Sequence, residues 1–239
     1  MATWVTHLMI ADAVLESVPE LCRQEFCVGN IAPDCNVENE DWTSFTPSRE
    51  VTHWMDGKRK SAGDGERFLH EYIEKKPCPE QRELSFLLGY YAHLLTDAAF
   101  QDMVLDPERV RAVWERIRQH PELGAASSGM EETWASAKKL IPKEERLKDI
   151  DSIERDYLDL HPDSGYLTEI LPLTAFPDYL EYLPHGAVVR KIGVMGYLPE
   201  KKSSRYPFIC LSPEEYQNFV TKTTALVSHA IRNWLENHR

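Results

Sequence analysis

The chain has 239 residues with a composition typical of a globular protein, so it is long enough to bury a sizeable core. Its net charge of -12 excludes an extended nucleic-acid-binding surface, because phosphate backbones are held mainly by Lys and Arg. No apolar run reaches the roughly 18 residues needed to span a bilayer as a transmembrane segment. The N-terminus lacks the pattern of a secretory signal, and the five irregularly spaced cysteines are typical of reduced thiols. These features predict a cytoplasmic protein and leave its oligomeric state unknown.

The first predicted element is an amphipathic helix over residues 4–21, with Thr3 as its N-cap. Pro19 is expected to end or kink this helix. His7 lies beside the apolar face, one turn into the helix. Taken alone, such a histidine is more often a core residue bonded to a backbone group than a ligand, and both interpretations stay open.

Residues 26–50 are predicted to form a long loop, because prolines, a glycine and several Asn, Asp and Thr interrupt any helical or strand periodicity of apolar residues. Loops of this length inside a compact domain are uncommon and are more often functional. Asp34 follows Pro33 in this loop and is either a turn-forming residue or a site residue. His53 stands between Val51 and Trp54, so its side chain is expected to face inward.

A helix predicted over residues 62–75 carries His70 and Glu74 at helical spacing among charged neighbours. We interpret this pair as part of a solvated, salt-bridged face.

The next helix, over residues 84–103 and starting as early as Glu80, is apolar on nearly every side and is therefore expected at the centre of the fold. His93 and Asp97 are four residues apart and point to the same side of this helix, where Gly89 leaves space. A buried carboxylate is costly unless it is paired or coordinates a metal. The polar side of this helix is therefore a candidate site.

Three more amphipathic helices are predicted over residues 107–120, 131–140 and 142–160. A short strand is predicted within residues 185–198, and a final helix over 212–238 opens with a Ser-Pro-Glu-Glu start signal. No low-complexity linker indicates a boundary between domains. The sequence therefore predicts an all-α fold, with one multi-helix domain over residues 1–239.

Five residues in the first hundred each have an ordinary structural explanation when taken alone, but together they form a possible set of metal ligands. They are His7, Asp34, His53, His93 and Asp97. Three neutral imidazoles and two carboxylates suit zinc or another borderline divalent ion. A tetrahedral catalytic zinc takes three protein ligands and a water, so five donors exceed what one ion needs. We therefore expect two ions.

Four stretches carry a resemblance to a known family: THLMIAD at 6–12, GNIAPD at 29–34, VTHW at 51–54 and FLLGYYAHLLTD at 86–97. Their order and spacing resemble the zinc-dependent phospholipase C family and, more loosely, the single-strand-specific zinc nucleases of the same all-helical fold. The resemblance implies that His7 ligates one zinc ion. It implies that Asp34, His53 and His93 surround another, with Asp97 bridging the two ions.

The chain departs from this family at two places. The secreted phospholipases begin with a tryptophan whose amine and carbonyl are zinc ligands, whereas Trp4 lies inside this chain. Met103 stands where the family has a histidine of its third zinc site. We therefore expect two metals rather than three. The candidates to complete the second site are Asp102, Glu38, Asp41 and His229.

Such a site predicts a metal-dependent hydrolase that cleaves a phosphate ester, here a phosphodiester, by attack of a metal-activated hydroxide. The resemblance gives Asp34 the added role of general base. The substrate is either a lipid or a small-molecule phosphodiester such as a nucleotide. Arg190 and Lys191 either meet its phosphate or belong to a surface loop. The alternative is a non-enzymatic helical protein that a structural metal holds together.

Overall fold

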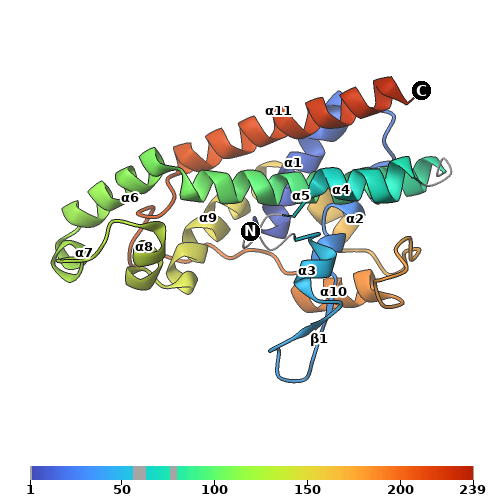
Figure 1. The fold of residues 1–239 in the computed structure, drawn as a ribbon. Coiled ribbons are helices and arrows are strands. Elements are labelled where there is room, and N and C mark those ends of the chain that lie inside the picture. The colour runs from blue at the N-terminus through green and yellow to red at the C-terminus, as the bar shows by residue number, and fades with distance from the viewer. Residues whose placement is uncertain (1, 56–62, 76–79, 239) are drawn as a thin grey trace. The chain divides into compact units, whose positions relative to one another are not determined.

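The computed structural model describes residues 2–55, 63–75 and 80–238 (Figure 1). The regular elements of this part of the chain are helices apart from one small antiparallel hairpin, in which β1 (Val37–Glu38) pairs with β2 (Phe45–Thr46), so the predicted all-α class is confirmed. The helical elements in chain order are α1 (Trp4–Ser17), α2 (Arg23–Gly29), η1 (Ala32–Asp34), α3 (Arg49–Thr52), α4 (Gly65–Leu69), η2 (His70–Glu74), α5 (Gln81–Leu105), α6 (Pro107–Gln119), α7 (Pro121–Ala126), α8 (Trp134–Leu140), α9 (Lys143–Leu160), η3 (Tyr166–Ile170), α10 (Ala187–Met195) and α11 (Pro213–Asn237).

The chain divides into two compact units. The first unit contains residues 1–99, 162–197 and 220–239, and the second contains residues 100–161 and 198–219. Both α5 and α11 contribute one end to each unit. The prediction of a single domain over residues 1–239 stays a prediction.

Side-chain caps fix the ends of the first and last helices where the sequence predicted them. Thr3 Oγ1 accepts a hydrogen bond from the backbone N–H of Thr6, and α1 ends at Ser17, two residues before Pro19. At the start of α11, Ser212 and Glu215 form a reciprocal capping box, with each side chain accepting from the other's backbone N–H at 3.1 and 2.8 Å. Such caps satisfy the free N–H groups of a first helical turn.

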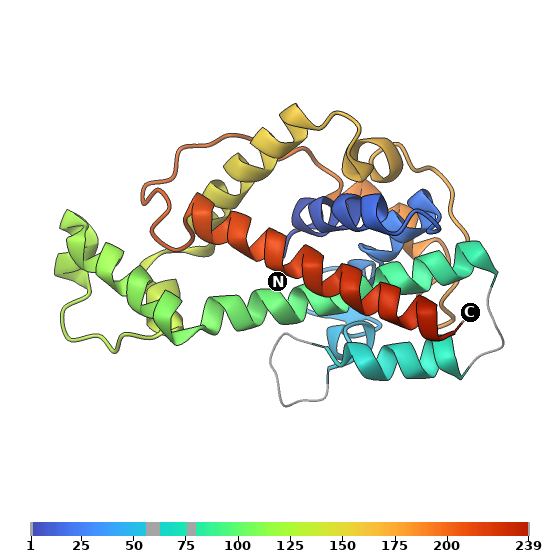
Figure 2. The same cartoon turned by 90° about the horizontal axis from the view of Figure 1, so that it is seen from above.

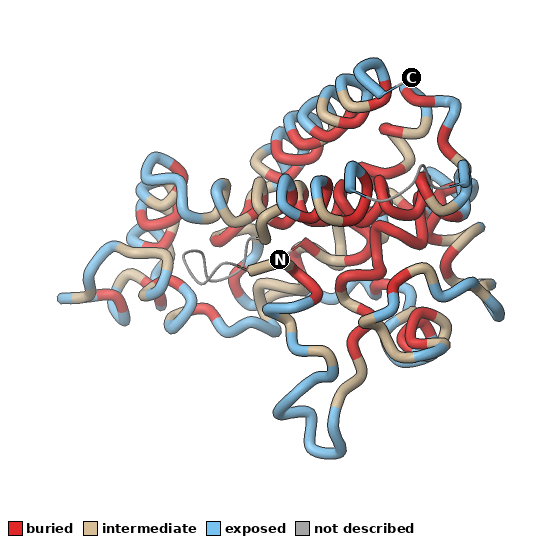
Figure 3. The backbone as a smooth tube through the Cα atoms, turned by 45° about the vertical axis from the view of Figure 1, so that its right-hand side comes forward, coloured by how far each residue is buried: buried red, intermediate tan, exposed pale blue. Residues whose placement is uncertain are grey.

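Helix α5, teal to green in Figure 2, carries a run of buried residues in the first unit, as its apolar sequence predicted, and Figure 3 colours buried residues red. Leu87, Leu88 and Tyr90 are almost completely buried on it. Gly89 does not leave open space, because a Cβ there would lie 2.3 Å from the Phe26 carbonyl oxygen of α2. Gly29 of α2 lies opposite Gly89, and a Cβ at Gly29 would likewise lie too close to backbone atoms of α5. The two glycines let the backbones of α2 and α5 touch, which no larger residue would allow.

Two other predictions need correction. Residues 26–50 are not one loop, since they include most of α2, the turn η1, the hairpin and the start of α3. The strand predicted within 185–198 is wrong, because α10 forms there instead. Val188 and Ile192 are four residues apart and both buried, so the segment has one apolar helical face rather than an alternating strand pattern.

The predicted second helix is also divided: α4 begins at Gly65 and continues as a π-helix to Glu74. Ala62, where the prediction placed its start, lies outside the described residues.

The second unit has its own hydrophobic core around Trp114. Val113, Ile117, Ala137 and Ile141 pack with it, and the Trp114 indole donates to the backbone carbonyl of Thr133 at 3.1 Å. The buried indole N–H is therefore satisfied, as burial of a polar group requires.

The described cysteines, which are Cys22, Cys27, Cys35 and Cys210, are free thiols, as predicted, and Cys78 lies outside the described residues. Among the described helices, none combines the length and the apolarity that crossing a bilayer requires. A cytoplasmic location stays a prediction.

Candidate metal centre

The five residues singled out in the sequence meet inside the first unit. His7 lies in the second turn of α1, Asp34 ends η1, His53 follows the last residue of α3, and His93 and Asp97 lie on α5. His7 Nε2 is 3.6 Å from Asp97 Oδ1, and His53 Nε2 is 3.3 Å from Asp34 Oδ1. The four residues other than Asp34 are at most 1 % exposed. Helices α1 and α5 therefore bring His7 and Asp97 together.

Hydrogen bonds at the outer nitrogens orient two of the imidazoles. His93 Nδ1 lies 2.8 Å from the backbone carbonyl of Asn30, and because a carbonyl can only accept, this nitrogen carries the proton. The neutral His93 ring then has its free lone pair on Nε2, which faces the cluster. His53 Nδ1 is bonded to Thr52 Oγ1 at 2.9 Å, which likewise leaves Nε2 facing inward. Metal-ligating histidines are usually held by such outer partners.

The inner atoms of four residues are spaced as the donors of one metal ion would be. His53 Nε2 is 3.4 Å from His93 Nε2 and 3.8 Å from Asp97 Oδ2, and His93 Nε2 is 3.9 Å from the same oxygen. Zinc bonds of about 2.0–2.1 Å in a tetrahedron place donors about 3.3–3.4 Å apart. The four separations among Asp34, His53, His93 and Asp97, from 3.3 to 3.9 Å, therefore lie within about 0.6 Å of those in a tetrahedral zinc site.

A second group of possible ligands overlaps the first. His7, His93 and Asp97 form one set of close donors, and Asp34, His53 and His93 form another. Since Nδ1 of His93 is bonded to Asn30, His93 offers only Nε2 and can serve one ion. Asp97 instead has one oxygen toward His7 and the other toward His53 and His93. The two carboxylate oxygens of Asp97 thus face different groups, one oxygen toward each.

The environment of His7 does not fit a core histidine bonded to a backbone group. Its ring is completely buried, and neither ring nitrogen has a hydrogen-bond partner in the described part of the chain. It stacks on the His93 ring with centroids 3.9 Å apart and an interplanar angle of 5°. Buried imidazole nitrogens without partners are costly, so they fit a ligand better than a packing residue.

Burial and mutual contact set the charge states of the cluster. Burial, with the neighbouring His7, lowers the pKa of His93 to about 3, so this imidazole is neutral at pH 7. Burial alone would raise the pKa of the Asp34 and Asp97 carboxyls, but their histidine contacts outweigh it and lower both pKa values. The centre therefore holds neutral imidazole and ionised carboxylate, the forms that bind divalent ions.

Sequence reasoning missed three residues that contact the carboxylates. The Arg49 guanidinium donates to Asp97 Oδ2 at 3.1 Å and lies 4.0 Å from Asp34 Oδ1. The Trp4 indole donates to Asp34 Oδ2 at 3.1 Å, and the backbone N–H of Ala2 donates to Asp97 Oδ1 at 3.1 Å. Arg49 precedes His53 by four residues, one helical turn, and this spacing was the signal that could have identified it.

The residues suggested to complete the second metal site are not part of this cluster. Glu38 accepts from Arg190 and Lys191 at 2.7 and 2.8 Å, so these two cations are bound by a carboxylate. Asp41 is exposed and bonds to Thr43 in the hairpin. His229 is exposed, and Asp102 belongs to the second unit. On the His7 side, Asp97 Oδ1 lies 3.6 Å from His7 Nε2 and accepts a hydrogen bond from the Ala2 N–H.

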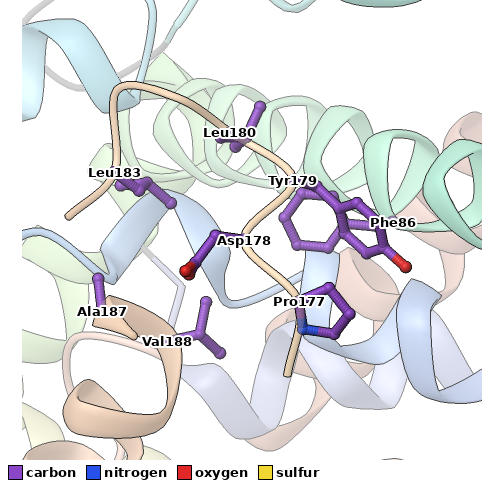
Figure 4. A pocket seen from close by; sticks show the side chains of 8 residues that line it. All are labelled: Phe86, Pro177, Asp178, Tyr179, Leu180, Leu183, Ala187 and Val188. Carbon is purple, nitrogen blue, oxygen red and sulfur yellow. The ribbon is translucent and has the colours of Figure 1, made fainter. Parts of the chain in front are cut away.

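A small pocket elsewhere in the first unit is a packing feature. It is lined mainly by apolar side chains around Phe86, whose ring lies 5.1 Å from that of Tyr179 (Figure 4). Its one carboxylate, Asp178, is bonded to His185 and to the backbone N–H of Gly186 at the start of α10. The exposed pair of His70 and Glu74, 2.9 Å apart, is a surface ion pair as predicted.

The fold and the cluster together define a class: an all-helical protein with a buried set of histidine and aspartate side chains that could hold divalent ions. Residues 6–100 match the family model described as zinc dependent phospholipase C. The resemblance inferred from the four sequence stretches is confirmed over these residues, which contain all five members of the cluster. No curated protein and no solved structure matches the chain. The match and the cluster support a metal-dependent, phospholipase-like function.

Proposed function

We propose that the chain is a zinc-dependent hydrolase that cleaves a phosphodiester, as a phospholipase C does. The observation that carries this proposal is the close spacing, 3.3–3.9 Å, of donor atoms from Asp34, His53, His93 and Asp97, in a segment that matches the family model. His7 Nε2 and Asp97 Oδ1, which are 3.6 Å apart, would help to hold the second ion of the proposed pair. Other divalent ions with a preference for nitrogen and oxygen donors are compatible with the same set.

The metal pair, when bound, would polarise the phosphoryl oxygens and bring the pKa of a water molecule near neutrality. The protein's own contribution is to hold its donors in one protonation state and orientation. Asn30 fixes the His93 ring, Thr52 fixes His53, and the Trp4 indole fixes the Asp34 carboxylate. Fixed donors need no reorganisation when charge develops on the phosphate.

Asp34 is proposed as the general base. Its side chain is 10 % exposed, whereas those of His7, His53 and Asp97 are 0–1 % exposed, so it is the member of the cluster that water reaches most easily. Its lowered pKa keeps it ionised at neutral pH, so it can accept a hydrogen bond from water and orient it. It would therefore combine ligation with orientation of the attacking water.

The substrate is proposed to be a lipid or small-molecule phosphodiester. The test uses purified protein with a chromogenic phosphodiester, a chromogenic phosphomonoester and phosphatidylcholine vesicles, each with and without a chelator. The proposal predicts diester cleavage that the chelator abolishes and added zinc restores. Cleavage that survives chelation, or no cleavage of any of the three by zinc-loaded protein, contradicts it. The second result would favour a structural metal site.

A further inference from the structure

We propose that Arg49 is the phosphate-binding residue of this centre and that its guanidinium competes with the metal for Asp97 when no substrate is present. This inference rests on the proposed function, since it assigns the group that holds the substrate's anionic oxygens. It concerns a residue outside the metal-ligand set.

The position of Arg49 at the start of α3 places a cation at the edge of the cluster. Its side chain is 28 % exposed, whereas those of His7, His53 and Asp97 are 0–1 % exposed. The guanidinium still reaches inward, to 3.1 Å from Asp97 Oδ2 and 4.0 Å from Asp34 Oδ1. Among the described residues, Arg49 is therefore a cationic side chain that contacts the ligand cluster and is also exposed to solvent.

The oxygen that Arg49 contacts also lies close to two histidine donors of the cluster. Asp97 Oδ2 lies 3.8 Å from His53 Nε2 and 3.9 Å from His93 Nε2. A divalent ion among these atoms would share Asp97 Oδ2 with the guanidinium, and two cations on one oxygen repel each other. Arg49 would then give up part of this contact, which its solvent exposure allows.

The released guanidinium has the right chemistry for a phosphodiester. Arginine presents a planar fork of N–H donors that matches two phosphate oxygens, whereas lysine presents a point charge. The two carboxylates and Arg49 carry a net charge of about −1 without metal, and two divalent ions would bring the centre to about +3. The chain as a whole is acidic, so this positive charge would be confined to the metal-loaded centre. Arg49 would lie on the side of the centre that faces solvent.

The test measures zinc affinity and phosphate affinity separately, each on the full chain. Zinc affinity is measured by competition with a chromophoric chelator, and binding of inorganic phosphate to zinc-loaded protein by calorimetry. Arg49→Gln is expected to bind zinc about tenfold more tightly than wild type, because a competing cation is gone. The same variant is expected to bind phosphate at least about tenfold more weakly. Hydrolysis of a chromogenic phosphodiester should fall about a hundredfold in kcat/KM.

Arg82→Gln is the matched control. It removes the same charge from a side chain that is 73 % exposed at the start of α5, eleven residues or about 16 Å along the helix from His93. Its zinc and phosphate affinities should stay within twofold of wild type. Arg49→Lys keeps the charge without the planar fork, so it should show weakened phosphate binding even if Arg49→Gln does not fold. Circular dichroism establishes folding of each variant.

Two results overturn the proposal: zinc binding that is unchanged or weaker in Arg49→Gln, or phosphate affinity that is unchanged in a folded Arg49 variant. The first would mean that Arg49 merely supports the carboxylates. Failure of the proposed function is a separate outcome, since it would appear as wild-type protein that binds zinc and phosphate but cleaves no phosphodiester.

Discussion

The contact between α2 and α5 makes a sharp prediction about Gly89. A Cβ at this position would lie 2.3 Å from the Phe26 carbonyl oxygen and 3.1 Å from the Cα of Gly29, and both obstacles are backbone atoms. Gly89→Ala must therefore push α2 away from α5. The next residue after α2 is Asn30, whose carbonyl accepts the hydrogen bond from His93. The substitution should thus disturb packing and the metal centre together.

The magnitude follows from two contributions. Overpacking a close contact costs about 1–3 kcal/mol, and losing the bond that orients His93 costs about 1 kcal/mol more. A total of about 3 kcal/mol corresponds to a fall in Tm of about 6–12 °C for a chain of this size. Loss of an outer partner of a metal-ligating histidine weakens metal binding by about 10–100-fold. Gly89→Ala should show both effects.

Gly193→Ala is the control for Gly89→Ala. Gly193 lies inside α10, and nothing stands within 4 Å of the added Cβ. The control should raise stability slightly, by up to about 1 kcal/mol, because alanine favours a helix more than glycine does. Thermal denaturation and zinc titration measure both variants. The packing account is refuted if Gly89→Ala melts within about 2 °C of wild type and binds zinc equally well.

Two predictions concern pH and buried charge. The pKa of His93 is lowered by burial to about 3, below its value in the unfolded chain, so the unfolded state takes up the proton first. The metal-free protein should therefore lose stability as pH falls from about 6.5 toward 3, by up to about 1.4 kcal/mol per pH unit, and chemical denaturation of His93→Gln should show a shallower dependence. Burial raises the pKa of Asp149 to about 6, so stability falls as pH rises from about 4 to 6 and the ionised carboxylate keeps it lower above that range. Asp149→Asn keeps an oxygen that can accept the hydrogen bond from the Phe208 N–H. In the same assay this variant should be about 1 kcal/mol more stable than wild type at pH 8, and the gain should be lost below about pH 4. An equal gain at both pH values would contradict the assignment of the effect to the buried charge of Asp149.

The sequence was most informative where one strong period or one terminal signal decided the structure. The apolar helix around His93 and the Ser-Pro-Glu-Glu start of α11 were predicted correctly. An apolar helical segment and a capping sequence can both be recognised from neighbouring residues alone. The strand predicted within residues 185–198 failed for a physical reason. Short apolar runs are compatible with either period, and the packing of Val188 and Ile192 on one face favoured the helix.

The candidate site was predicted as a set of residues, but not as an arrangement. His93 and Asp97 could be placed together because helical spacing fixes their directions. The contacts of Asp97 with Arg49 and the backbone of Ala2 join residues 48 and 95 positions apart. Contacts over such separations depend on how the helices pack, which local periodicity does not encode. The same holds for the Asn30 carbonyl, which reaches His93 only because Gly29 and Gly89 touch.

The central claim is that these five side chains bind metal, and the most direct test is to count zinc atoms per chain by elemental analysis. Protein purified without a chelator should contain about two zinc ions. His93→Ala and Asp97→Ala should each lose bound metal, whereas His70→Ala, which removes an exposed histidine paired with Glu74, should keep the wild-type content. Wild-type protein without metal, or full occupancy in both cluster variants, would contradict the account.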